Sequence, residues 1–226
     1  MKLLALETST QACSAALSID GDIHEQFEIA PRGHGQLILN MVDQLLAEAQ
    51  LQAGQLDGIA FGRGPGAFTG VRIATAVVQG IAFGADLPVV PVSSLAALAQ
   101  GAYRQGRHRA VLAAFDARME EVYWGAFEEK AGLMVACGAE RVCPPQDVVM
   151  PTAVADWVGA GDGWQAYPEA LKAACGDVPL CHHDTFPHAQ DIARLALPQL
   201  VDGETVMAEQ ALPIYLRDNV VKKRSG

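Results

Sequence analysis

The feature that most constrains this chain is a glycine-rich corner at residues 62–70, which reads GRGPGAFTG. An apolar stretch at 56–61 leads into the corner and indicates a strand. Thr69 is placed to cap the first free amides of a helix that follows. The sequence therefore predicts a strand-to-helix corner. Such a corner can hold an anion, because glycines let backbone N–H groups point inward and a helix end adds partial positive charge.

The helix after the corner, predicted at 71–85, has no polar face. It reads VRIATAVVQGIAFGA, and Arg72 is its one charged residue. A helix with apolar or small residues on every side must be buried on more than one side. We expect one stripe to pack on a sheet of its own domain. The remaining stripe is covered either within the same domain or by a partner.

The composition indicates a compact globular protein and argues against direct binding of nucleic acid. Half of the 226 residues are hydrophobic and 19% are charged, and the length allows one large domain or two of about 100 residues. The formal net charge of −10 would repel a phosphate backbone. The one basic cluster, Lys222 to Arg224, is interpreted as a solvated tail.

The cysteines and the N-terminus indicate a cytoplasmic protein. The five cysteines are odd in number and form no Cys-x-x-Cys pair, so we expect reduced thiols and neither a disulfide framework nor a zinc ribbon. Only four apolar residues separate Lys2 from Glu7, which is too short for a signal peptide. No uninterrupted apolar run reaches the length of a membrane span of about 18 residues, so no membrane association is expected.

The order of predicted elements, βββαβα, occurs twice. In the first half we expect strands at 2–6, 12–19, 22–29, 56–61 and 88–92 and helices at 35–49, 71–85 and 94–103. In the second half we expect strands at 110–115, 121–127, 133–139 and 154–158 and helices at 145–150, 164–174 and 191–200, with a closing stretch at 211–216. Glu7 and Asp116 end the first strand of each copy. The predicted fold is α/β, with two domains at 1–106, completed by 205–226, and at 107–204.

This duplicated unit is similar to the ribonuclease H-like fold of actin, hexokinase and Hsp70. Four stretches resemble one family within it, the tRNA threonylcarbamoyladenosine biosynthesis proteins called TsaB or YeaZ. The stretches are LALETS at 4–9, GPGAFTGVRI at 64–73, DARMEEVY at 116–123 and PIYLR at 213–217. The glycine-loop motif is specific because it occurs together with the Asp-Ala-Arg-Met segment.

The resemblance implies a noncatalytic subunit that holds no cofactor on its own. In this family the protein pairs with a related catalytic subunit, TsaD, and an ATPase, TsaE. The assembly moves a threonylcarbamoyl group from threonylcarbamoyl-adenylate to N6 of the adenosine beside the anticodon, in tRNAs that read codons beginning with adenine. The subunit meets tRNA only through the complex.

The resemblance also implies that the pairing surface uses the helices at 35–49 and 70–85. The candidate contact residues are apolar or small, with one arginine: Leu37, Met41, Leu45, Arg72, Ile73, Ala74, Val77, Gly80, Ile81 and Gly84. Small residues let another helix approach closely, and the larger ones supply apolar area. Without the partner, two copies could pair through the same surface as a homodimer.

An alternative function is a small-molecule phosphotransferase of the sugar-kinase type. In that class the turn after the first strand binds phosphate, and here Glu7, Thr8 and Ser9 could hold a magnesium-bound phosphate. A Walker lysine pattern is missing, and the glycine turn at 159–163 is weak evidence for an adenosine pocket. The turn is therefore a weak candidate site.

Other candidate sites have simpler explanations. His34 lacks a histidine four residues later, where Ile38 stands, so the metal-binding pair of the catalytic relative is absent. The segment Cys181 to Asp184, with His188, carries metal-binding residue types but lies in an apparent loop, so surface histidines are the preferred interpretation. A third hypothesis, metalloprotease activity, requires a bound metal. Asp116, Arg118, Glu120 and Glu121 could act as acids and bases, although Arg118 is close enough to pair with Asp116.

Overall fold

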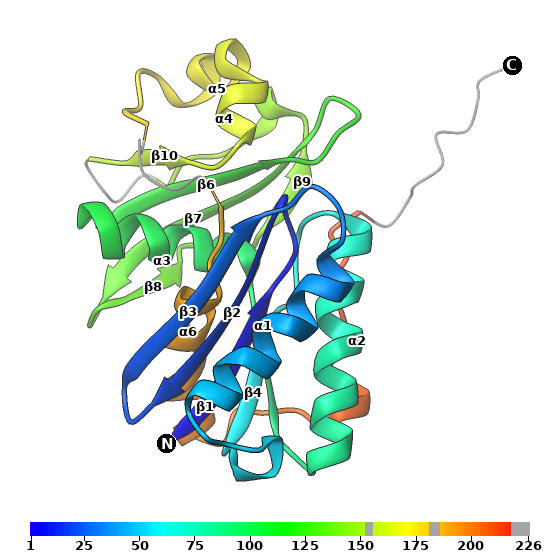
Figure 1. The fold of residues 1–226 in the computed structure, drawn as a ribbon. Helices are drawn as coiled ribbons and strands as arrows, with labels where there is room; N and C mark the ends of the chain where they lie inside the picture. The colour runs from blue at the N-terminus through cyan, green and yellow to red at the C-terminus, as the bar shows by residue number, and fades with distance from the viewer. Residues whose placement is uncertain (152–155, 181–185, 218–226) are drawn as a thin grey trace, which may run out of the picture.

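The chain forms two sheets joined by two helices, and the computed structural model describes residues 1–151, 156–180 and 186–217 (Figure 1). The first sheet has the order β3-β2-β1-β4-β5, and the second has the order β10-β6-β7-β8 with β9 also paired to β7. The strands are β1 (Lys2–Glu7), β2 (Ala12–Ile19), β3 (Asp22–Ile29), β4 (Gly58–Gly62), β5 (Val89–Val92), β6 (Ala110–Asp116), β7 (Val122–Lys130), β8 (Leu133–Ala136), β9 (Arg141–Cys143) and β10 (Val158–Ala160).

The two sheets repeat one topology, which confirms the predicted α/β fold. In each half the first strand pairs antiparallel with the second, and the second pairs antiparallel with the third. The first strand of each half also pairs in parallel with a later strand, β1 with β4 and β6 with β10. Glu7 and Asp116 are therefore the last residues of equivalent strands.

Helices cover both faces of the first sheet. The helices are α1 (His34–Glu48), α2 (Phe68–Ala85), α3 (Ser94–Gly106), α4 (Gly163–Ala166), α5 (Pro168–Cys175) and α6 (Ala189–Val201), with 3-10 turns η1 (Ala53–Gln55), η2 (Pro145–Asp147) and η3 (Ala208–Gln210). α1 and α2 lie side by side on one face, and α6 lies on the other (Figure 1). Leu4 and Leu6 face α1 and α2, whereas Leu3 and Ala5 face α6, because successive side chains of β1 alternate.

The helices α3 and α6 form the seam between the halves. α3 packs on β6, β7 and β8 of the second sheet, and α6 packs on β1, β2, β4 and β5 of the first. α6 falls within the range predicted for the second domain, 107–204, but its apolar stripe is buried on the first sheet. The predicted domain limits stay a prediction, and the observed packing ties each half to the other.

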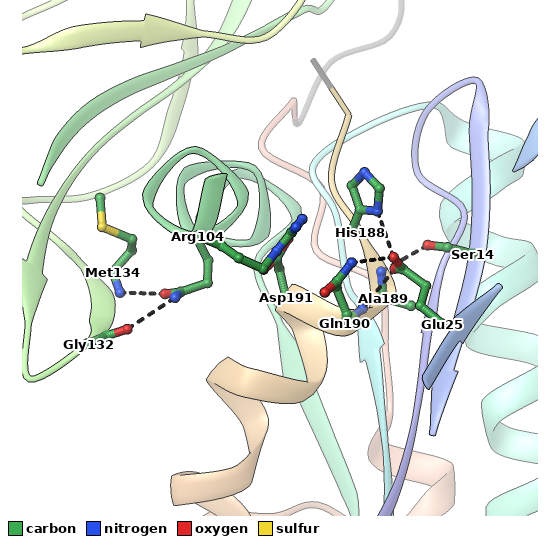
Figure 2. Close-up of polar contacts among 10 residues, drawn as sticks. Ser14, Glu25, Arg104, Gly132, Met134, His188, Ala189, Gln190 and Asp191 are labelled. Atoms are coloured by element: carbon green, nitrogen blue, oxygen red, sulfur yellow. Dashed lines mark hydrogen bonds and ion pairs between the residues drawn. The ribbon is translucent and has the colours of Figure 1, made fainter. Parts of the chain in front are cut away.

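Polar contacts at this seam join segments far apart in sequence (Figure 2). Arg104 of α3 makes two hydrogen bonds of 2.9 Å to the buried carboxylate of Asp191 on α6. The Gln100 amide donates to the carbonyl of Gly132 and accepts from the N–H of Met134. At the start of α6, the N–H of Ala189 donates to Ser14 Oγ at 2.9 Å, and the N–H and side-chain amide of Gln190 donate to Glu25.

Several predicted elements were wrong in extent. The helix predicted at 71–85 begins at Phe68, and Thr69 does not cap it: Ala67 occupies the N-cap, and its carbonyl accepts the first helical hydrogen bond from Val71. The helix predicted at 145–150 is only the single turn η2, which begins at a pair of prolines. The helix predicted at 164–174 is divided at Pro168, which has no N–H to continue the ladder.

The remaining differences concern strands. The strand predicted at 133–139 ends at Ala136, and the following segment forms β9, which was not predicted. Part of the strand predicted at 154–158 lies outside the described residues, and the strand that is observed is β10. The closing stretch at 211–216, for which no secondary structure was predicted, runs along α2, where the Gln79 side chain donates to the carbonyl of Ala211 at 3.0 Å.

We predict that Arg104→Met destabilises the protein strongly near neutral pH. The Asp191 side chain is 0% exposed, so without the guanidinium it is an unpaired buried charge, which costs about 3–5 kcal/mol of unfolding free energy. Burial already raises the pKa of Asp191, and losing Arg104 raises it further. The native state then binds a proton more readily than the unfolded chain, so the loss should shrink as the pH falls from about 7 to about 5.

Urea unfolding at both pH values measures this effect, and Arg109→Met is the matched control. Arg109 is 77% exposed, and its partner Glu129 keeps a second donor, the N–H of Gly132, so removing Arg109 should cost less than removing Arg104. Equal losses for the two variants, or a loss at Arg104 that does not change with pH, would contradict the prediction.

Candidate functional site

The turn after β1 is buried. Glu7 is 1% exposed, Thr8 0% and Ser9 1%. Glu7 Oε1 accepts the N–H of Ser9 at 2.5 Å, and Glu7 Oε2 accepts the hydroxyl of Ser94 at 2.8 Å. Burial raises the pKa of Glu7, and these hydrogen bonds oppose the rise. The three candidate phosphate ligands thus face the interior of the chain.

The glycine-rich corner packs directly onto this turn. The Thr8 hydroxyl donates to the carbonyl of Gly70 at 2.7 Å, and the N–H of Ala67 donates to the carbonyl of Ser9 at 2.6 Å. A Cβ at Gly70 would lie 2.0 Å from the carbonyl oxygen of Thr8, and one at Gly66 would lie 2.4 Å from that of Ser9. These glycines therefore allow close packing of two backbone segments, in place of the anion cradle that the corner could have formed.

The helix α2 is half covered by its own fold. One stripe packs on the first sheet, where Ala74, Val78 and Ala82 are 0–1% exposed. The opposite stripe is exposed: Arg72, Ala76, Gly80, Phe83 and Gly84. Phe83 is 83% exposed, the largest value among the exposed large hydrophobic residues described. The residues that the structure describes therefore leave this stripe uncovered.

The exposed stripe of α2 also carries glycines that have no side chain to project from it. A Cβ at Gly80 or at Gly84 would meet nothing within 4 Å, so both positions open to space. By length and composition α2 also meets the criterion for a membrane span, with a mean hydropathy of 1.3, although a third of it is buried inside the chain. The burial of one stripe on a sheet identifies α2 as a helix of a folded domain with one open face.

The predicted contact residues divide into exposed and buried groups. Arg72, Gly80 and Gly84 are exposed, and Leu37, Ile73, Val77 and Ile81 are half-buried. Met41, Leu45 and Ala74 were wrongly placed on the surface, because they are only 4%, 3% and 0% exposed. They lie on the helix stripes that face the sheet. Whether a partner binds the other seven residues stays a prediction.

The C-terminal segment adds to the open face of α2, which sequence reasoning missed. The Arg72 guanidinium carbon lies 3.2 Å from the centre of the Phe68 ring and 5.0 Å from that of Tyr215. The N–H of Ile214 donates to the carbonyl of Arg63 at 2.9 Å and holds the segment beside the helix. Phe68 is 62% exposed and Tyr215 45%. The sequence analysis assigned residues 205–226 to the first domain and noted the PIYLR stretch, but neither indicated that the segment lies beside α2.

The charged turn after β6 is held by internal contacts. Arg118 pairs with Asp116 at 2.7 Å, which confirms the expected pairing, and the Tyr167 hydroxyl donates to Asp116 at 3.1 Å. Arg217 donates to the carbonyl of Ala117 and pairs with Glu121. These contacts give Asp116, Arg118 and Glu121 structural partners, and Glu120 is exposed.

The candidate metal ligands do not converge in the part of the chain that the structure describes. His34 Nε2 lies 3.1 Å from the carbonyl oxygen of Thr10, and Ile38 is fully buried in the core. His188 stacks on Phe27 and lies 2.9 Å from Glu25. Residues 181–184 lie outside the described ranges. No group of three histidines, cysteines or acidic residues is close enough to hold a metal among the residues searched.

We predict opposite effects for alanine at two glycines of α2. Gly70→Ala drives a Cβ into the backbone of Thr8 and should lower the free energy of unfolding by more than about 2 kcal/mol. Gly80→Ala meets open space and should raise it by about 0.5–1 kcal/mol, because alanine is the better helix former. Chemical denaturation measures both, and a destabilised Gly80→Ala would show that this stripe is not open.

A second prediction concerns Glu7, whose raised pKa makes its charged form costly. Between the ordinary carboxyl pKa and the raised value, the native state binds more protons than the unfolded state, so stability falls as the pH rises. Glu7→Gln can keep the acceptor for Ser9 and removes the ionisation. Its stability relative to the parent chain should therefore increase from about pH 4 to about pH 7. A difference that does not vary with pH would refute this assignment.

Comparison with known proteins gives consistent matches over the whole chain. Residues 19–225 match the TsaD family, described as tRNA N6-adenosine threonylcarbamoyltransferase. The chain is 42% identical to the tRNA threonylcarbamoyladenosine biosynthesis protein TsaB of Escherichia coli, covering 99% of this chain and 98% of that protein. It is 38% identical to TsaB of Haemophilus influenzae, covering 99% and 97%.

A solved structure is similar over nearly the same extent. It is the crystal structure of an uncharacterized protein from Pseudomonas aeruginosa, described as similar to peptidase YEAZ. The TM-score is 0.90 at 50% sequence identity, and the match covers 96% of this chain and 99% of that one. The glycine-rich corner and α2 lie inside the region matched by the TsaD family.

Proposed function

The chain belongs to the TsaB (YeaZ) family of tRNA threonylcarbamoyladenosine biosynthesis proteins, and from this premise we propose that it is a noncatalytic subunit of a tRNA threonylcarbamoyltransferase. It acts in the cytoplasm with a TsaD-like catalytic subunit and a TsaE-like ATPase. The complex transfers threonylcarbamoyl from threonylcarbamoyl-adenylate to N6 of the adenosine beside the anticodon. The subunit brings no cofactor of its own and meets tRNA only through the complex.

The open stripe of α2 is the observation that carries this proposal. Ala76, Gly80 and Gly84 are spaced one helical turn apart, so a helix of a partner could approach the α2 backbone closely along the stripe. Phe83 would be covered in the process, and burying such a side chain contributes about 1.5–3 kcal/mol. The stripe therefore has the shape and the apolar character of a helix-docking surface.

The state of the turn at Glu7 supports a noncatalytic role. In the sugar-kinase alternative, the side chains of this turn must reach a magnesium-bound phosphate. Here Glu7 accepts hydrogen bonds from Ser9 and Ser94, and the hydroxyl of Thr8 is bound to the backbone of Gly70. The catalytic work is accordingly assigned to the partner.

The family match favours a partner of the same fold. This chain matches a family named after the catalytic subunit, so the two proteins can present equivalent helix pairs to each other around a pseudo-twofold axis. Two copies of this chain could pair in the same way when the partner is absent. The net charge of −10 favours contact with tRNA through the partner and not through this chain.

We predict that Gly80→Arg abolishes tight association without harming the fold. The added side chain projects from a position with no neighbour within 4 Å, so the isolated protein should keep its stability. It would prevent close approach of a partner helix and should weaken binding to the TsaD-like subunit at least about tenfold, measured by calorimetry. Self-association, measured by analytical ultracentrifugation, should fall as well.

Ala173→Arg is the matched control. Ala173 is also exposed on a helix, but that helix, α5, belongs to the second half of the chain and lies away from α2 (Figure 1). This variant should bind the catalytic subunit as the parent does. If Gly80→Arg is folded and binds normally, the stripe is not the docking surface and the proposal is overturned.

A further inference from the structure

A cleft lies at the seam between the halves, on the side of the first sheet that α6 covers. Its volume is about 480 Å³, within the range of small-molecule sites. Four separate segments line it: the β2–β3 hairpin, α3, the β7–β8 turn and α6. Both halves of the fold therefore contribute to one cleft, and it is separate from the open stripe of α2.

All charged side chains that line this cleft are basic. They are Arg104, Arg107 and Arg194, in a chain where acidic residues outnumber lysine and arginine by 26 to 16. Arg104 is held by Asp191 in a paired hydrogen bond (Figure 2). Within the described residues, Arg107 and Arg194 have no carboxylate at ion-pair distance. Two positive charges at the cleft are thus left without a counter-ion from the described chain.

Carboxylates close in sequence to the cleft are bound elsewhere. Asp20 pairs with the amino group of Met1, and Asp22 lies 3.2 Å from His24. Glu129, just before the β7–β8 turn, pairs with Arg109. These acidic groups already have partners, so they are not held as counter-ions for Arg107 or Arg194.

Arg194 is a stronger indication of an anion site than Arg107. The C-terminal end of a helix attracts cations, and this alone would explain Arg107 at the end of α3. Arg194 lies inside α6, where no such end exists. Its Nε atom is buried and has no hydrogen-bond acceptor among the described residues. A buried guanidinium nitrogen without an acceptor is costly, so no described group fixes Arg194 through this atom. Arg194 also lines the cleft, and the terminal N–H donors of its guanidinium are the ones that a bound anion would reach.

The rest of the cleft has apolar walls, and hydrogen bonds fix the position of one of them. Ile23, Leu133 and Leu197 provide aliphatic walls. The Tyr103 ring lies 5.5 Å from the guanidinium carbon of Arg107 and offers a flat surface. The Gln100 amide bonds to Gly132 in the β7–β8 turn and to Met134 in β8, and it fixes the wall that this turn forms (Figure 2).

We propose that this cleft binds a phosphomonoester carried on a small flat or apolar group. The guanidinium groups of Arg194 and Arg107 bind the phosphate oxygens, because planar N–H donors match the geometry of a tetrahedral oxyanion. The aliphatic walls and Tyr103 hold the apolar part. Arg104 is already paired with Asp191, so it is not assigned to the phosphate.

The test is a titration of the full chain with phenyl phosphate, followed by calorimetry and by backbone amide chemical shifts. We expect saturable binding with shift changes confined to α3, α6 and the β7–β8 turn. Inorganic phosphate should bind more weakly, because it lacks the flat group, and phenol should not bind. Arg194→Gln should weaken binding of phenyl phosphate at least about tenfold.

Arg32→Gln is the matched control, because Arg32 is exposed and lies in the loop before α1, outside the cleft. It should bind phenyl phosphate as the parent chain does. Circular dichroism and thermal unfolding establish that both variants are folded. If Arg194→Gln misfolds, Arg107→Gln provides the same test at an exposed position.

Three outcomes would overturn the proposal. The first is equal binding of phenyl phosphate by the parent chain and by folded Arg194→Gln. The second is an equal affinity for phenyl phosphate and inorganic phosphate that disappears at physiological salt, which would mean an adventitious ion only. The third is a pattern of shift changes located outside the cleft. None of these depends on binding to the TsaD-like subunit, so the proposed function can stand or fall separately.

Discussion

The contact between the backbone at Thr8 and the backbone at Gly70 determines how the rest of the first half is arranged. It places the first turn of α2 against the end of β1, with no room for a side chain between them. Because a helix is rigid over this length, fixing its start also fixes which stripe of α2 faces the sheet. The stripe containing Ala74 and Val78 is buried, and the opposite stripe remains uncovered.

The two halves are interlocked through their helices. α3 follows the first sheet in sequence yet packs on the second, and α6 follows the second sheet yet packs on the first. Asp191 and Gln100 add polar contacts to this arrangement, and both are almost fully buried. The cleft lined by Arg194 exists only because these helices meet, so it belongs to neither half alone.

Much of the fold could be predicted from the sequence, because alternation and helical periodicity reflect burial directly. The limits of β2 and β3 were predicted to the residue, and the repeated strand order followed from turn signals.

The candidate site was predicted less well than the fold. Periodicity identified the apolar residues of α1, but not which of them face the core. Leu39, which is 48% exposed, was therefore left out of the predicted contact residues, whereas the buried Met41 was included.

Other features could not be predicted from the sequence, for a physical reason. The segment at 211–217 has no regular period, because it is held by single hydrogen bonds to Arg63 and Gln79 and not by a ladder. The arginine cleft combines side chains from distant segments, and no local pattern records such a meeting. The glycine-rich corner was recognised, but an anion cradle and a close backbone contact require the same residues, and only the three-dimensional packing distinguishes them.

The smoothness of the outer face of α2 has a consequence for how this protein can change over generations. A side chain added at Gly80 or Gly84 meets no neighbour among residues 1–151, 156–180 and 186–217, so steric clashes with the fold do not oppose it. Apart from the preference of the helix itself, natural selection at these positions therefore acts through contacts with other proteins. The inner glycines, Gly66 and Gly70, are constrained by the fold itself, because any side chain there would clash with the backbone. We therefore expect substitutions to accumulate more slowly at the glycine-rich corner than on the outer face of α2.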